Sequence, residues 1–233
     1  MKIAVIPARG GSKRIPRKNI RPFLGVPLLA RTLTLVRQSG VFDRIVVSTD
    51  DEEIAAIAAG AGGEVPFRRP PELANDTAGT LPVIKHAIGA IEADASRVDA
   101  VCCVYPAAVL ARAGDFRAAA NMLRDFDVDY VFAATSFGYP IQRALRRVGE
   151  GRCEMFWPEH IETRSQDLEA SYHDAGQFYF GHRDAWMAER PPFGPRSMML
   201  ELPRYRVQDI DTPEDWLRAE LIFRLLEAEQ HAG

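Results

Sequence analysis

Short apolar segments of strand length alternate along this chain with longer segments in which apolar residues recur at helical spacing. Four runs are apolar or β-branched: Lys2–Pro7, Arg44–Thr49, Ala100–Tyr105 and Tyr130–Ala134. The segments between them place apolar residues three or four positions apart, which is the period of one helix face. Repeated strand–helix units form a mostly parallel sheet with helices on both faces. We therefore expect an α/β fold, whose ligands bind beyond the carboxyl ends of the strands.

Two threonines mark expected helix starts in this pattern. Thr80 precedes a helical apolar register and is expected to cap that helix. Thr212 is followed by Pro213 and by two acidic residues, which is typical of an N-cap, a first helical position and a first turn. The second signal predicts a helix that begins at residue 213.

The alternation is interrupted between Phe137 and Gly176. This stretch contains Pro140, a turn sequence at Gly149–Gly151 and a polar tract. The turn sequence predicts a short hairpin. We expect residues 137–176 to form a small inserted subdomain.

The composition narrows the class of protein further. Hydrophobic residues make up 47% of the 233 and charged residues 26%, which argues against disorder and fibres. No apolar run approaches the roughly 18 residues of a membrane span, and the first residues lack the pattern of a signal peptide. The three cysteines match neither a disulfide framework nor a zinc site. We expect a cytoplasmic protein without a membrane partner.

Positive charge is concentrated at the start of the chain. Nine basic residues precede the first acidic residue, Asp43, although the net charge of the chain is −3. A basic pole on an acidic body indicates a local site for an anion. The alternative is a basic surface loop without a ligand.

The loop Pro7–Asn19 follows the first expected strand and combines glycines with basic residues. Gly10 and Gly11 let backbone N–H groups approach an oxyanion, and Arg9, Lys13 and Lys18 add positive charge. Such a loop can hold a polyphosphate, although it matches neither the dinucleotide fingerprint nor the Walker A motif. The alternative is a tight turn with solvated basic side chains.

Two acidic residues near the other end of the chain complement this loop. Asp209 and Asp211 are two positions apart, so they share one face of an extended segment. Carboxylates together with phosphate oxygens suit Mg²⁺. The alternative is that Asp211 helps to cap the last helix while Asp209 is solvated.

A polar stretch late in the insertion is a candidate binding surface. Arg164–Leu168 and Tyr172–Gln177 are dense in side chains that form hydrogen bonds with sugar hydroxyls and carboxylates. A polar loop on the subdomain is the alternative.

Several of these segments together resemble the CMP-sialic acid synthetase family of cytidylyltransferases. They are Ile6–Lys13 with Pro16–Asn19, Val47–Asp50, Arg69–Leu73 and Asp209–Thr212, in order along essentially the whole chain. The resemblance implies a single Rossmann-like nucleotidyltransferase domain over residues 1–233. It also implies CTP as a substrate and Mg²⁺ as the cofactor.

Within that family, four segments are most similar to the pseudaminic acid branch: Tyr139–Ala144, Arg164–Leu168, Tyr172–Tyr179 and Leu202–Gln208. This likeness implies that the anomeric hydroxyl of a nine-carbon 2-keto sugar acid attacks the α-phosphorus of CTP. The products would be the CMP-sugar and pyrophosphate. It further implies a homodimer, in which residues 137–176 make the dimer contact and close over the neighbouring sugar site.

The resemblance also implies roles position by position. The implied catalytic residues are Lys18, Arg9 and Asp211, and the implied metal ligands are Asp209 and Asp211. The implied nucleotide-binding residues are Ala8, Arg9, Gly10, Gly11, Ser12, Lys13, Lys18, Asn19 and Arg69. The implied sugar-binding residues are Tyr105, Arg164, Gln166, Tyr172, His173 and Gln177.

One turn departs from the family pattern and keeps alternatives open. Ala107-Ala108-Val109 stands where the family usually has threonine, a small residue and proline. The altered turn favours one alternative, a chain that binds nucleotide without turnover. A second alternative is that the sugar is N-acetylneuraminic, legionaminic or 3-deoxy-manno-octulosonic acid. A nucleic-acid binder is disfavoured, because the chain is acidic overall and the basic loop lacks interleaved aromatic residues.

Overall fold

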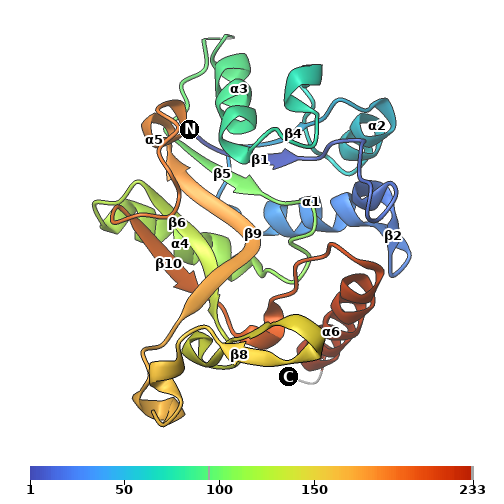
Figure 1. Cartoon of the computed structure of the whole chain (residues 1–233). Helices are drawn as coiled ribbons and strands as arrows, with labels where there is room; N and C mark the ends of the chain where they lie inside the picture. The colour runs from blue at the N-terminus through green and yellow to red at the C-terminus, as the bar shows by residue number, and fades with distance from the viewer. Residues whose placement is uncertain (94, 232–233) are drawn as a thin grey trace.

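A six-stranded sheet with the order β10-β6-β9-β5-β1-β4 forms the centre of the computed structural model (Figure 1), which describes residues 1–93 and 95–231. All its strands run parallel except β9, which is antiparallel to both of its neighbours. The mostly parallel sheet expected from the sequence is thus confirmed. The six strands are β1 (Lys2–Pro7), β4 (Arg44–Ser48), β5 (Ala100–Val104), β6 (Tyr130–Ser136), β9 (Tyr172–His182) and β10 (Ser197–Glu201).

Helices cover both faces of this sheet, as the alternating pattern requires. On β1, Ala4 and Ile6 face a core shared with α1, α2 and α4, whereas Ile3 and Val5 face a second core shared with α3 and α5. The last helix, α6, packs over the basic loop in a third cluster that includes Ile210. The helices are α1 (Leu28–Gln38), α2 (Glu52–Gly60), α3 (Thr80–Glu92), α4 (Ala113–Asp125), α5 (Arg183–Met187) and α6 (Pro213–His231).

Short elements complete the fold outside these layers. Two small antiparallel pairs are formed by β2 (Pro22–Phe23) with β3 (Val26–Pro27), and by β7 (Leu145–Arg147) with β8 (Cys153–Met155). The single 3₁₀ turns are η1 (Lys18–Ile20), η2 (Pro71–Leu73), η3 (Ile141–Arg143), η4 (Gly149–Gly151), η5 (Pro158–His160), η6 (Ser165–Asp167) and η7 (Arg204–Arg206).

Of the two threonines expected to cap helices, Thr212 does so and Thr80 does not. Thr212 caps α6 as predicted, because its hydroxyl accepts from the Asp215 N–H at 3.2 Å and Asp215 accepts from the Thr212 N–H at 2.8 Å. Thr80 does not cap α3, whose N-cap is Gly79. The Thr80 hydroxyl instead lies 2.7 Å from that of Tyr105, the residue that follows β5.

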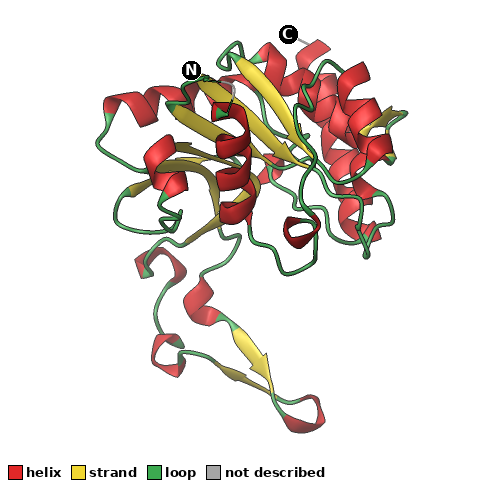
Figure 2. Cartoon of the chain, turned by 90° about the horizontal axis from the view of Figure 1, so that it is seen from above, coloured by secondary structure: helices red, strands yellow, loops and turns green. Residues whose placement is uncertain are grey.

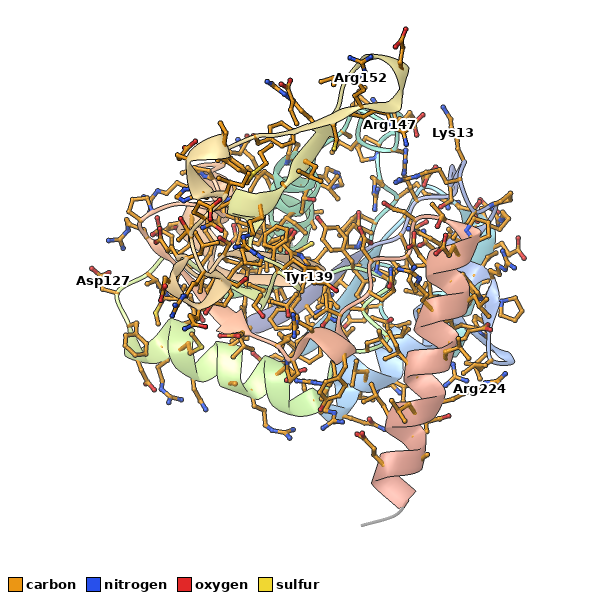
Figure 3. The ribbon with its side chains drawn as sticks, turned by 60° about the horizontal axis from the view of Figure 1, so that its bottom comes forward. Lys13, Asp127, Tyr139, Arg147, Arg152 and Arg224 are labelled. Carbon is orange, nitrogen blue, oxygen red and sulfur yellow. The ribbon has the colours of Figure 1, made fainter. Side chains whose placement is uncertain are left out.

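Residues 137–171 leave the sheet between β6 and β9 and form an arm. The expected hairpin around Gly149–Gly151 is present as β7 and β8, and it extends away from the helices and the sheet (Figure 2). Arg147 and Arg152 project from it (Figure 3). Residues 172–176 belong to β9, so the part of the expected insertion that leaves the sheet ends at residue 171.

No helix among the described residues combines the length and the apolar character that a bilayer crossing demands. The cysteines Cys102 and Cys103 are buried in β5, whereas Cys153 is exposed on the arm, and all three are free thiols.

Candidate active site

The basic loop and the two aspartates line one cleft beyond the carboxyl ends of β1 and β5, with a volume of about 410 Å³. This is the ligand side of an open α/β sheet. The loop and the acid pair lie near opposite ends of the chain, and the sheet and α6 bring them together. From these two segments the cleft receives Arg9, Ser12, Lys13, Arg14, Lys18, Asn19, Asp209 and Asp211.

Backbone contacts to β4 and to the loop after it hold the first turn of the basic loop. The Ala8 N–H donates to the Ser48 carbonyl at 2.9 Å, and the Gly10 N–H donates to Asp50 Oδ1 at 3.0 Å. A Cβ atom on Gly10 would lie only 2.7 Å from a carboxylate oxygen of Asp51. Glycine is therefore required at position 10 for packing, and the loop is anchored independently of a ligand.

Arg17 fixes the second half of the loop. Its backbone is left-handed, with φ at 57°, and its guanidinium pairs with Asp51 at 2.5 Å and with Glu53 at 2.5 Å. Asp51 also accepts the Ile54 N–H and so caps α2. The hydrogen bond from Arg17 lowers the pKa of Asp51 below its ordinary value. Arg17 therefore has a structural role that the sequence did not indicate.

The cations of the loop face carboxylates across the cleft. Arg9 and Lys13 both pair with Asp76, which lies in the segment before α3, and the Arg9–Asp76 distance is 2.6 Å. Lys18 Nζ donates to the Ile210 carbonyl at 2.7 Å and lies 3.5 Å from Asp211. Cations that can bind an anion are thus present, and each already has an anionic or carbonyl partner.

Asp209 and Asp211 both line the cleft, where Asp209 is exposed and Asp211 is half-buried. Partial desolvation by the surrounding protein raises the pKa of Asp209 above its ordinary value, and the charge of Asp211 raises it further, while Lys18 opposes the shift. A divalent cation between the two carboxylates would relieve this repulsion, and carboxylate oxygens are ligands that Mg²⁺ accepts. The acid pair therefore fits a magnesium ion. Asp211 also pairs with Arg14 at 2.8 Å.

Two further predicted nucleotide residues line the cleft: Asn19 at the end of the loop, and Arg69 outside it. Asn19 Nδ2 donates to the Arg9 carbonyl at 2.9 Å, which fixes the amide. Arg69 is buried and donates to Ser48 Oγ at 3.1 Å and to the Ser48 carbonyl. Burial lowers the pKa of Arg69 to about 10, so it remains protonated at neutral pH. Ala8, Gly10 and Gly11 belong to the loop but are not among the side chains that line the cleft.

Of the six predicted sugar residues, the structure brings only Tyr105 into this cleft. Arg164 and Gln166 lie on the arm, and Tyr172 and His173 begin β9 where the arm returns to the sheet. Gln177 is buried, and its side-chain amide donates to the Arg206 carbonyl at 2.9 Å. Arg164, Gln166, Tyr172, His173 and Gln177 therefore do not line the cleft of their own chain.

Outside the basic loop, three polar side chains that the sequence prediction missed line the cleft: Thr80, Asp174 and Tyr179. Thr80 was interpreted as a helix cap, and the other two belong to β9, a strand that the sequence pattern did not reveal. The available signal was the polar segment Tyr172–Gln177, which contains Asp174.

Comparisons with known proteins give independent evidence on the family of the chain. A family model described as "Cytidylyltransferase" matches residues 3–146. The chain belongs to the cytidylyltransferase family. This nucleotidyltransferase is 43% identical over 223 residues to a pseudaminic acid cytidylyltransferase of Campylobacter jejuni, and the match covers 96% of each chain. It is 30% identical to N-acylneuraminate cytidylyltransferase A of Danio rerio, over 93% of this chain and 49% of that protein.

A solved structure confirms the fold of this cytidylyltransferase. It is a CMP:2-keto-3-deoxy-manno-octonic acid synthetase complexed with CTP. Its TM-score is 0.67 at 18% identity, with 98% of this chain and 99% of the other covered. The family and the α/β architecture predicted from the sequence are both confirmed.

Proposed function

We propose that this cytidylyltransferase transfers CMP from CTP to pseudaminic acid and releases pyrophosphate. The observation that supports this most strongly is the 43% identity to a pseudaminic acid cytidylyltransferase over 96% of both chains. A cleft in which loop cations face an acid pair is the kind of site that the reaction needs. Such chemistry depends on positioning and charge neutralisation.

In this proposal the anomeric hydroxyl oxygen of the sugar forms the new bond to the α-phosphorus. The bond from the α-phosphorus to the bridging oxygen breaks, and pyrophosphate leaves with that oxygen. Arg9, Lys13 and Lys18 contact the phosphates, and Lys18 stabilises the charge that develops in the transition state. The backbone of Ala8–Ser12 approaches the phosphates, while Asn19 and Arg69 hold the cytidine.

Mg²⁺ would be held by Asp209 and Asp211 and would neutralise phosphate charge when bound. The test is a Mg²⁺ titration of turnover for Asp211→Asn, with Asp184→Asn on the surface of α5 as the control. We expect the Mg²⁺ needed for half-maximal turnover to rise at least tenfold for Asp211→Asn only. An unchanged titration would remove Asp211 from the metal site.

We further propose a homodimer in which the arm of one subunit reaches the cleft of the other. Large apolar side chains on the arm are exposed, among them Tyr139 at 86% and Ile161 at 64%. Such a surface is usually covered by a partner. Arg164, Gln166, Tyr172 and His173 would then approach the sugar of the neighbouring subunit. Gel filtration of the chain with and without residues 144–156 tests this dimer.

The sugar specificity is tested by pyrophosphate release with CTP, Mg²⁺ and a panel of sugar acids. We expect the highest kcat/KM with pseudaminic acid. The similarity to an N-acylneuraminate cytidylyltransferase favours N-acetylneuraminic acid as the second candidate. Nucleotide binding without pyrophosphate release on any sugar would overturn the proposed enzymatic function.

We also propose a cytoplasmic location for this activity. The three free thiols support it, since cysteines stay reduced in that compartment. Cell fractionation with an antibody against the chain tests it.

A further inference from the structure

The pairing of β9 with β6 is irregular beside the cleft. Phe132 pairs with Tyr179, and Ala134 pairs with Asp174, so two steps along β6 correspond to five steps along β9. The extra residues on β9 form a bulge, whereas the pairing of β9 with β5 on its other side is regular. A bulge re-aims side chains and is common next to functional sites. Here it brings Asp174 back beside Tyr179.

Asp174 is held in a fixed position by two donors within this bulge. The Tyr179 hydroxyl donates to Oδ2, and the Gly176 N–H donates to Oδ1 at 3.0 Å. Gly176 has a φ of +63°, which favours glycine there. A carboxylate offers about four acceptor sites, so each oxygen keeps capacity for a further donor. Burial, followed by the effects of Tyr105 and Asp174, raises the pKa of Tyr179, so its hydroxyl stays protonated and donates.

The surroundings of Asp174 form a polar wall of the cleft. The hydroxyls of Thr80 and Tyr105 lie 2.7 Å apart, and the rings of Tyr105 and Tyr179 meet edge to face at 5.7 Å. Thr80, Tyr105, Asp174 and Tyr179 all line the cleft. A Cβ atom built on Gly176 would lie 3.6 Å from the carboxyl carbon of Asp209, so this wall adjoins the acid pair.

The charge of this wall determines what can bind against it. The basic loop supplies the cations that attract phosphates, whereas no ion pair joins Asp174 to another side chain in the described part of the chain. An unpaired carboxylate repels phosphate and the carboxylate of a sugar acid. It attracts neutral groups that donate hydrogen bonds, namely hydroxyls and amide N–H groups.

We propose that Asp174 is a specificity-determining residue that accepts hydrogen bonds from hydroxyl or acylamino N–H groups of the sugar acid. Tyr179 is the positioning residue that orients its carboxylate. The inference rests on the proposed function, since it assigns the wall to the acceptor sugar. It also orients the sugar, because the sugar carboxylate must point away from Asp174.

The experiment measures sugar binding by calorimetry in the presence of Mg²⁺ and a CTP analogue that cannot be cleaved between the α- and β-phosphates. For Asp174→Asn, which preserves size and removes charge, we expect the Kd of the sugar acid to rise about tenfold, or about 1.4 kcal/mol. The Kd of the CTP analogue should change less than twofold. For Tyr179→Phe we expect a smaller rise in the same direction.

Asp184→Asn is the matched control, because Asp184 is exposed at the start of α5 and is absent from the cleft lining. It should leave both dissociation constants unchanged. A merely structural role for Asp174 would weaken sugar and nucleotide binding together, and that result, like an unchanged sugar Kd, overturns the proposal.

Using several sugar acids separates this inference from the proposed function. Preferred binding of a sugar other than pseudaminic acid overturns the proposed function, while the ratio of Kd values for that sugar still tests Asp174. If the wild-type chain binds the CTP analogue but none of the sugars, both proposals fall.

Discussion

Arg206 forms a two-point ion pair with Asp115 that ties the segment carrying the acid pair to the start of α4. The guanidinium nitrogens lie 2.8 and 3.1 Å from the two carboxylate oxygens. The two side chains are only 8% and 13% exposed. Replacing Arg206 by methionine would leave the buried Asp115 carboxylate without its cation, with the Arg112 N–H at 2.7 Å as its remaining donor. We expect the free energy of unfolding to fall by about 3 kcal/mol, at the low end for a broken buried pair.

For a chain of this length, that loss corresponds to a fall in Tm of about 6–12 °C. The assay is urea-induced unfolding followed by circular dichroism, supported by a thermal scan. Arg218→Met is the matched control, because Arg218 pairs with Glu214 at 2.7 Å but the two side chains are 61% and 72% exposed. An exposed helical pair contributes about 0.3–0.5 kcal/mol. Equal losses in the two variants would refute the reasoning that burial makes the first pair strong.

Three further outcomes are expected. Lys18→Ala should lower kcat by two to three orders of magnitude, because a transition-state donor of this kind contributes about 2.7–4 kcal/mol; a kcat within fivefold of wild type in the pyrophosphate-release assay would contradict this. Asp76→Asn should make inhibition by pyrophosphate several-fold tighter and leave inhibition by CMP unchanged, because two loop cations lose an anionic competitor; weaker pyrophosphate inhibition would instead mean that Asp76 orients those cations for the ligand. Glu92→Gln should be less stable than wild type at neutral pH. The hydrogen bond from Arg183 lowers the pKa of Glu92 below its ordinary 4.5, so the stabilisation is present above that value and is lost as the pH falls through the lowered pKa. Unfolding curves at neutral and strongly acidic pH check this, since the difference between the two proteins should vanish in acid.

The parts of the fold that follow from local pattern were predictable from the sequence. β1 spans Lys2–Pro7 as predicted, because its apolar residues fill both cores and proline ends the run. β9 was not predicted, although it is central in the sheet. Its polar residues from Asp174 to Gln177 lie in the bulge, so its sequence does not show a regular alternation. β10 was missed because it is an edge strand with mixed exposure.

The sequence also predicted the basic loop and the acid pair of the site, but not the positions of the residues on the arm. Loop cations after the first strand and carboxylates before the last helix were expected to meet, because a polyphosphate with its metal needs both, and both segments line the cleft. The positions on the arm could not be placed in the same way, since the course of an irregular segment is not set by hydrophobic periodicity. Gln177 is an example of a predicted sugar-binding residue that the structure places elsewhere. It is polar and lies in a polar stretch, yet it is buried and donates to Arg206.

In the folded chain, basic residues near the start of the sequence already form ion pairs with carboxylates. Arg17 pairs with Asp51 and keeps that partner as part of the loop, so it is not available to a ligand. Arg9 and Lys13 pair with the single carboxylate of Asp76, whose side chain is 43% exposed. If CTP binds to Arg9 and Lys13 as proposed, its phosphates exchange with Asp76, and its affinity is the difference between two sets of ionic contacts. That exchange would return the Asp76 carboxylate to water when phosphate binds and recover it when phosphate leaves, so the same ion pairs would weaken the binding of CTP and favour the release of pyrophosphate.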